Sequence, residues 1–263
     1  MYYYTKEWYL RSKCTGLYLN LKSCTEEEAR SAEYYEKQLA IYAEEIRFEC
    51  EQIKNTSYDV FAEDRTEPEE LLREEFKQRI AENNPDEADF IAAKRLSERI
   101  AAVKLSLPGE ILAEIPDIRI FALNRADNKT AERITSYAEE CRRFMQETDF
   151  RFEEEYPART EPIPDELWEE YGFAGGRIKK ILRKGRDITM IIDNAGSGSD
   201  VTAMHINDAD VERLDDGLED SLWIANEMYL TNGEYELCAL CRKGEAFPEF
   251  ILHSKDISFE FDR

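Results

Sequence analysis

Two cysteines near the C-terminus, Cys238 and Cys241, have the Cys-x-x-Cys spacing of zinc ligands and redox centres. The run that contains them starts at Glu234, follows an Asn-Gly pair and is rich in apolar residues, which predicts a β-strand. Residues three apart on a strand point to opposite faces of the sheet, so the two sulfurs cannot converge on one ion. We therefore expect buried or half-buried cysteines and no metal ligands at this position.

The two histidines, His205 and His253, each lie on or beside an expected strand. No Gly-x-Ser-x-Gly turn occurs near them, so the sequence indicates no serine or cysteine triad. Asp200, Asp208 and Asp210 are close to His205 in the sequence and would raise its basicity or help to form a metal site. A surface or structural histidine is the interpretation we favour.

The stretch Asp193–Asp200, Asp-Asn-Ala-Gly-Ser-Gly-Ser-Asp, has the composition of a calcium or phosphate loop. A calcium loop needs a bidentate glutamate near its end, and none is present. A phosphate loop opens a helix, whereas Val201–Ile206 predicts a strand. We therefore predict a plain hairpin connection.

Helical carboxylates offer another route to chemistry, because acids three or four apart on an inward face can hold Mg²⁺ for hydrolysis. Glu45 with Glu49, and Glu70 with Glu74, have this spacing. Both pairs lie mainly off the apolar stripes of their helices, which favours solvated surface charge.

The stretch Arg177–Arg186 holds six bases in ten residues. Ile178, Ile181 and Leu182 between them favour a packed strand, and nucleic-acid binding would need more basic surface and less surrounding acid. We expect these bases to pair with the acidic helices of the same chain.

The chain of 263 residues has a formal net charge of −23, and the excess of acid is regional. The net charge is −11 in Glu26–Glu75, −8 in Glu147–Glu170 and −6 in Asn207–Asp220. Such a field repels nucleic-acid phosphates and anionic membranes, and it attracts basic proteins or divalent cations. The third stretch predicts an acidic loop whose candidate binding residues are Asp208, Asp210, Asp215, Asp216, Glu219 and Asp220.

Four long amphipathic helices are predicted to precede this tail. Capping boxes at Thr25–Glu28 and Thr66–Glu69 open the first two. Asp86 caps the third, and the fourth runs from Thr130 to about Phe152. Short links between such helices are typical of a helical bundle or layer.

Pro157, Pro162 and Pro164 predict a linker, after which the pattern changes to strands and a hairpin about Asn232-Gly233. We therefore expect an α+β protein, with an acidic helical domain of residues 1–160 and an antiparallel β-meander domain of residues 161–263. On the hairpin, Trp223, Ala225, Glu227 and Tyr229 are expected on one face. Both faces are largely apolar, so helices should cover one and further structure part of the other.

The two ends of the chain, Met1–Tyr9 and Glu227–Leu237, are similar to an uncharacterised bacterial family in the domain-of-unknown-function series. The resemblance implies a bacterial cytoplasmic protein and supplies no activity or site residues. The six dispersed cysteines, and the absence of apolar runs as long as a signal peptide or a membrane span, also favour the cell interior.

Three functions remain open. The leading hypothesis is a non-enzymatic acidic protein that binds or inhibits a basic partner, as an immunity protein or a nucleic-acid mimic does. The alternatives are a divalent-metal-dependent hydrolase that uses helical carboxylates, and a structural or adaptor protein. We expect no cofactor, no catalytic residue, and no nucleic-acid or membrane partner.

Overall fold

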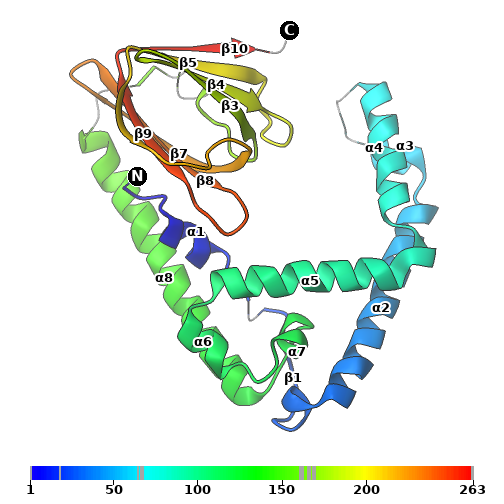
Figure 1. Cartoon of the computed structure of the whole chain (residues 1–263). Coiled ribbons are helices and arrows are strands. Elements are labelled where there is room, and N and C mark those ends of the chain that lie inside the picture. The colour runs from blue at the N-terminus through cyan, green and yellow to red at the C-terminus, as the bar shows by residue number, and fades with distance from the viewer. Residues whose placement is uncertain are drawn as a thin grey trace. The chain divides into compact units, whose positions relative to one another are not determined.

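The computed structural model describes residues 2–17, 19–63, 65, 68–159, 163–164, 167 and 170–261. The chain forms two compact units: Gly16–Ala138, the helical unit, and Met1–Thr15 with Glu139–Arg263, the sheet unit (Figure 1). Helix α8 (Asn128–Arg159) begins in the first unit and ends in the second. The predicted α+β class is confirmed. The domain boundary near residue 160 stays a prediction, because residues 160–162 lie outside the described part of the chain.

The helical unit is built from amphipathic helices, as predicted. On one side of helix α2, Ile46 and Cys50 pack against Ala88, Ile91 and Ala92 of the neighbouring helix α5. The elements of this unit are β1 (Lys22–Ser23), η1 (Glu28–Arg30), α2 (Ala32–Asn55), α3 (Tyr58–Ala62), α4 (Glu69–Glu82), η2 (Pro85–Glu87), α5 (Ala88–Ser106), α6 (Gly109–Glu114), α7 (Ile118–Ala122), β2 (Arg125–Ala126) and the first part of α8.

The predicted capping box at Thr25 and Glu28 is present, but it opens a shorter element than expected. Glu28 N–H donates to Thr25 Oγ1 at 3.1 Å, and Thr25 N–H donates to Glu28 Oε2 at 2.8 Å. This box closes the turn that leads into η1, and α2 begins after Ser31, whose hydroxyl accepts from Tyr34 N–H at 3.1 Å. The extended backbone of Ser31 interrupts the helix and needs a cap of its own. Residues 66 and 67 of the second predicted box lie outside the described residues.

Three further helix limits differ from the prediction. Asp86 does not cap α5, because the Asn84 side chain accepts from the Asp86 N–H and caps η2, which leads directly into α5. Asp127 caps α8, since its carboxylate accepts from the N–H and hydroxyl of Thr130 at 3.0 and 2.9 Å. Helix α8 also continues through Pro157, so the expected break there is wrong.

The sheet unit contains α1 (Lys6–Ser12), the end of α8 and eight antiparallel strands. Their order across the sheet is β10-β5-β4-β3-β7-β8-β9-β6. The strands are β3 (Arg177–Lys184), β4 (Asp187–Asp193), β5 (Val201–Asn207), β6 (Asp210–Leu214), β7 (Ser221–Thr231), β8 (Glu234–Arg242), β9 (Glu249–Ser254) and β10 (Asp256–Phe261).

Two bent segments curl this sheet around its own core (Figure 1). The pair β5 and β6 is nearly continuous in sequence, as is the pair β9 and β10. Strand β10 pairs with β5 and β6 pairs with β9, so the two segments run side by side around the bend. The stretch Asn207–Asp220, predicted as a loop, therefore contains strand β6, because Val211 and Leu214 pack against the core.

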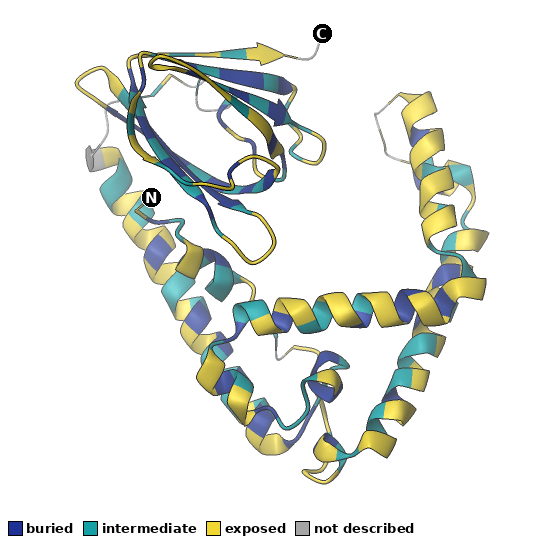
Figure 2. Cartoon of the chain, viewed as in Figure 1, coloured by how far each residue is buried: buried dark blue, intermediate teal, exposed yellow. Residues whose placement is uncertain are grey.

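The inside of the curled sheet is an aromatic and aliphatic core. The Trp223 ring meets Phe173 and Phe250 edge-on, with ring centroids 5.0 and 5.4 Å apart. Figure 2 shows buried residues concentrated along the strands and exposed residues on the turns. Burial of large side chains at about 25 cal/mol per Å² of apolar surface is the main stabilisation of such a core.

The outer face of β7 and β8 is also covered, as the apolar hairpin predicts. Tyr229 meets Tyr2 edge-on at 5.2 Å and Tyr156 of α8 at the same centroid distance. Tyr156 donates a hydrogen bond to the Met228 carbonyl. The N-terminal segment and the end of α8 thus pack on the sheet from outside. None of the described helices is long and apolar enough to cross a lipid bilayer.

Candidate functional site

Three acids of the predicted binding loop are engaged inside the sheet unit. Asp208 pairs with Arg186 at 2.9 Å, and Glu219 accepts the Ile181 N–H at 2.9 Å. Asp215 pairs with the guanidinium of Arg213 at 2.7 Å, which holds the pKa of Asp215 below its usual value. Through these ion pairs and this hydrogen bond, the three carboxylates stabilise the turns before and after β6.

The other three acids of that loop are exposed but not gathered. Asp210 begins β6, whereas Asp216 and Asp220 lie beyond its far end. Among the described residues none of the three side chains has an ion pair. The structure thus divides the predicted binding residues between the two ends of one strand.

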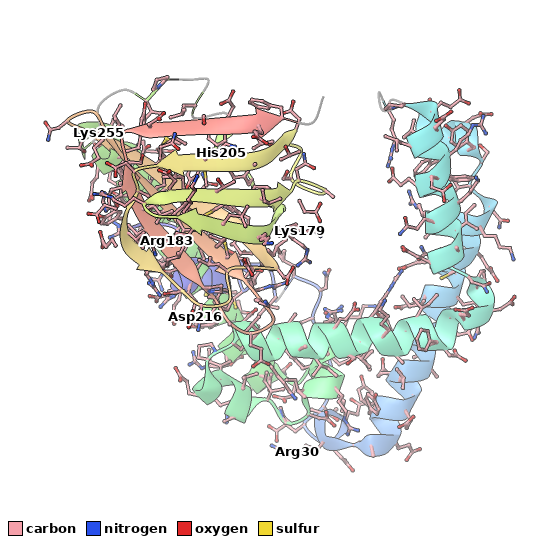
Figure 3. The ribbon with its side chains drawn as sticks, turned by 45° about the horizontal axis from the view of Figure 1, so that its top comes forward. Arg30, Lys179, Arg183, His205, Asp216 and Lys255 are labelled. Carbon is pink, nitrogen blue, oxygen red and sulfur yellow. The ribbon has the colours of Figure 1, made fainter. Side chains whose placement is uncertain are left out.

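His205 on β5, labelled in Figure 3, lies at the centre of a polar chain that crosses three strands. Its Nδ1 is 3.1 Å from Thr189 Oγ1 on β4, and its Nε2 is 3.0 Å from Glu260 Oε1 on β10. A hydroxyl, an imidazole and a carboxylate in this order could in principle activate a nucleophile. Thr189 lies on β4, which is paired on both sides, so its neighbouring backbone N–H groups are committed to the ladder and cannot stabilise an oxyanion.

The histidines therefore serve as cross-strand links. His253 on β9 likewise faces Glu212 on β6, with 3.1 Å between Nε2 and the carboxylate. Sequence proximity suggested Asp200, Asp208 and Asp210 as partners of His205, and the actual carboxylate is Glu260. Glu260 lies on β10, which pairs with β5 although the two strands are far apart in the sequence. No local sequence pattern indicates this pairing.

Cys238 and Cys241 point to opposite faces of β8, as predicted. Cys241 belongs to the inner core, whereas Cys238 lies on the outer face opposite Glu227. Burial raises the pKa of both thiols, that of Cys241 to about 12, which makes them poor nucleophiles and metal ligands at neutral pH. Within the described ranges, no three His, Cys, Asp or Glu side chains are grouped as metal ligands would be.

The Asp193–Asp200 stretch is the predicted hairpin connection between β4 and β5. Asp193 pairs with Lys179 of β3 at 2.9 Å. Gly175 packs against this turn so closely that an added Cβ would lie 2.3 Å from the Gly196 carbonyl oxygen. Lys179 and Arg183, labelled in Figure 3, lie on β3, and the ion pair of Lys179 is with the sheet and not with the acidic helices.

A buried carboxylate that the sequence reading passed over holds the N-terminal segment. Glu227 is 0% exposed. Its Oε1 accepts the N–H groups of Tyr3 and Tyr4 at 2.9 and 2.7 Å, and its Oε2 accepts the Tyr2 N–H at 2.8 Å and the Tyr229 hydroxyl at 2.9 Å. Four donors saturate the carboxylate, so it anchors structure. The available signal was a single charge in the apolar run Leu222–Leu230.

An exposed acidic face of α8 is the strongest candidate for a binding surface. Glu139, Glu140, Glu147 and Glu154 are exposed and follow helical spacing about Phe150, a residue that is itself 63% exposed. None of these four carboxylates has an ion pair with another described residue. We call this set the acidic face of α8.

A hollow of about 410 Å³ adjoins the Phe150 ring on the acidic face of α8. It is lined by Phe144, Glu147, Thr148, Phe150 and Arg151. Arg11 already stacks on Phe144, with its guanidinium carbon 4.5 Å from the ring centroid. Aromatic rings beside a carboxylate can hold the apolar stem and the charged end of a basic side chain together.

Comparison with protein-family models, curated proteins and solved structures found no match to this chain. The resemblance to the uncharacterised bacterial family therefore stays a prediction.

Proposed function

We propose that the chain is a non-enzymatic protein that binds a basic protein partner through the acidic face of α8, inside a bacterial cytoplasm. The observation that carries the proposal is the exposed Phe150 side chain beside an open hollow lined by Glu147, on a helix face whose four glutamates have no ion pair among the described residues. An exposed aromatic side chain within a charged rim is the arrangement of an interface hot spot.

The chemistry of the surface selects a lysine- or arginine-rich segment. A basic side chain entering the hollow would lay its stem on Phe150 and place its charge beside Glu147. The surrounding carboxylates speed encounter with a cationic partner and make association sensitive to salt. The regional excess of acid extends this field beyond the contact itself.

The alternative of a hydrolase with helical carboxylates has less support. Glu74 faces Lys77 at 3.5 Å, and Glu49 faces Arg95 at 2.8 Å. Each predicted glutamate pair thus has one member beside a cation, which competes with a metal ion for the same oxygens. No observation favours the structural or adaptor alternative over binding.

The test compares two double charge reversals in affinity capture from an extract of the source cells, followed by titration of the purified partner. Glu147→Lys with Glu154→Lys should weaken binding of the identified basic partner by at least about tenfold at low salt. Phe150→Ala should weaken it by about tenfold without loss of stability, because the ring is exposed.

The matched control is Asp210→Lys with Asp216→Lys, which makes the same charge change on exposed acids of the sheet. The control should bind within about twofold of wild type at moderate salt, where distant charges are screened. Equal weakening by both reversals would show a diffuse field without a site on α8. Weakening by the control alone would move the interface to the ends of β6.

A further inference from the structure

We infer that the helical unit holds a binding site for a small oxyanion of the phosphate type, between α2, α5 and the β1–β2 pair. The site is a pocket of about 70 Å³. This exceeds the roughly 10–15 Å³ that one water needs, and it is far below the about 300 Å³ of sites that enclose drug-sized ligands. The pocket is lined by Lys22, Gln38, Ile41, Tyr42, Glu45, Arg99, Leu123, Asn124 and Arg125.

Three cations meet here in a chain whose net charge is −23. Lys22, Arg99 and Arg125 come from three separate elements, and none has an ion pair with a described carboxylate. Most other arginines of the unit do have such pairs, for example Arg47 with Asp89 and Arg95 with Glu49. The lining holds three positive charges against the single carboxylate of Glu45, and the remaining repulsion between like charges costs free energy, which an anion in the pocket would offset.

Two of the cations are held in place by neutral acceptors that leave their charge available. Arg125 Nε donates to the Gln38 side-chain oxygen at 2.9 Å, and Gln38 is only 8% exposed. Arg99 donates to the side-chain oxygen of Asn124. A guanidinium has five N–H donors, so each arginine keeps donors for a ligand and can present two of them in parallel to one anion.

Backbone hydrogen bonds and the turn at Asn124 determine where Lys22 lies in the pocket. Lys22 N–H donates to the Asn124 carbonyl at 2.8 Å, next to the parallel register of Lys22 with Arg125. Asn124 has a φ of 60°, which ends α7 and turns the chain back toward α2. Asparagine tolerates this left-handed conformation better than most residues. The turn places Lys22 and Arg125 side by side on adjacent strands.

Size and donor geometry select the ligand. Forked guanidinium donors match the oxygens of phosphate, and the lysine adds a point charge. The pocket cannot enclose a nucleotide or a peptide. The ligand is therefore free inorganic phosphate or the phosphate group of a small monoester whose remainder extends into solvent.

The test measures binding of inorganic phosphate to the full chain by isothermal titration at constant ionic strength, with glycerol 3-phosphate as a second arm. Wild-type protein should bind one equivalent of at least one of them. Tighter binding of glycerol 3-phosphate would assign a monoester, and tighter binding of phosphate would assign the free ion. Failure of both to bind would overturn the inference.

Substitutions separate a site from general attraction of anions. Arg99→Gln, Arg125→Gln and Lys22→Gln should each weaken phosphate binding by about tenfold or more, since each charge-assisted bond is a strong one. Lys22→Gln remains informative if an arginine variant fails to fold, because the Lys22 side chain has no described hydrogen bond. Arg73→Gln, on exposed α4, is the matched control and should bind as wild type does.

Glu45 gives a test of opposite sign. It lines the pocket and would repel an anion there. Glu45→Gln should therefore tighten phosphate binding several-fold, whereas Glu36→Gln, on the same helix and outside the pocket, should leave it unchanged. If Glu45→Gln and Glu36→Gln had equal effects, or if Arg73→Gln weakened phosphate binding as much as the pocket variants do, phosphate affinity would depend on the net charge of the protein and not on this pocket.

Discussion

Glu227 shows how much one buried residue can organise. Its carboxylate accepts four hydrogen bonds, three of them from the backbone of Tyr2, Tyr3 and Tyr4. An acid on the outer face of a strand thereby determines where the other end of the chain packs. The aromatic side chains of that segment then cover the face from which the acid projects.

The carboxylate at position 227 predicts a large effect of an isosteric change. Glu227→Gln replaces an acceptor oxygen by an N–H₂ group that faces N–H donors, so buried donors lose their partner. We expect a loss of about 3 kcal/mol in the free energy of unfolding, measured by urea denaturation. Glu212→Gln, in the exposed pair with His253, is the control and should cost less than about 1 kcal/mol. Similar urea midpoints for both variants would contradict the anchoring role.

Residues whose partners are local in sequence were predicted well, and those with distant partners were not. The opposite orientation of Cys238 and Cys241 follows from strand geometry alone and is confirmed. Three of the four donors to Glu227, which are the backbone N–H groups of the N-terminal segment, come from non-local packing, and so does the carboxylate facing His205. Nothing in a linear pattern of residue types indicates which distant segments will meet.

At the scale of elements, the position of the β7–β8 hairpin was predicted correctly, but the pairing of residues along its two strands was not. The turn falls at Asn232-Gly233, yet an extra residue, Ile224, is bulged out between the pairs of Trp223 and Ala225. Trp223 therefore enters the inner core, while Glu227 and Tyr229 lie on the outer face, so the single face predicted for them is wrong. Beyond a bulge, the side chains that would have pointed inward point outward, and the reverse. Because both faces of β7 carry apolar residues, the sequence pattern gives no sign of this change.

The same turn allows a test of backbone conformation. Asn232 and Gly233 have φ values of 54° and 71°, as a two-residue hairpin turn of the I′ type requires. Gly233→Ala should lower the free energy of unfolding by about 1 kcal/mol, because a Cβ disfavours the left-handed region. Gly109→Ala is the control, since its added Cβ meets no atom within 4 Å and its φ is not in the positive range. An equal response of the two glycines to alanine in thermal melts would show that turn strain is not the cause.

Over the whole molecule, the class of the fold is readable from the sequence but the curl of the sheet is not. Helical periodicity before residue 160 and strand patterns after it predict an α+β protein, as found. The pairing of β5 and β6 with β9 and β10 joins segments far apart in the chain, and the length of each strand gives no sign of its partner. The acidic face of α8 was likewise visible as charge, while its exposure and its lack of ion pairs among the described residues required the structure.

The net charge of −23 makes a prediction for the chain as a whole. Many of its ion pairs are exposed and contribute little, whereas excess carboxylates repel one another in the folded state more than in the expanded unfolded chain. Screening at 0.1 M salt already acts over about 10 Å. Raising NaCl from 20 to 300 mM should therefore increase the melting temperature by about 3–5 °C. Potassium chloride should act alike, and phosphate and sulfate are left out because they would also occupy the proposed pocket. A fall in melting temperature would show instead that attraction between the ion pairs outweighs the repulsion.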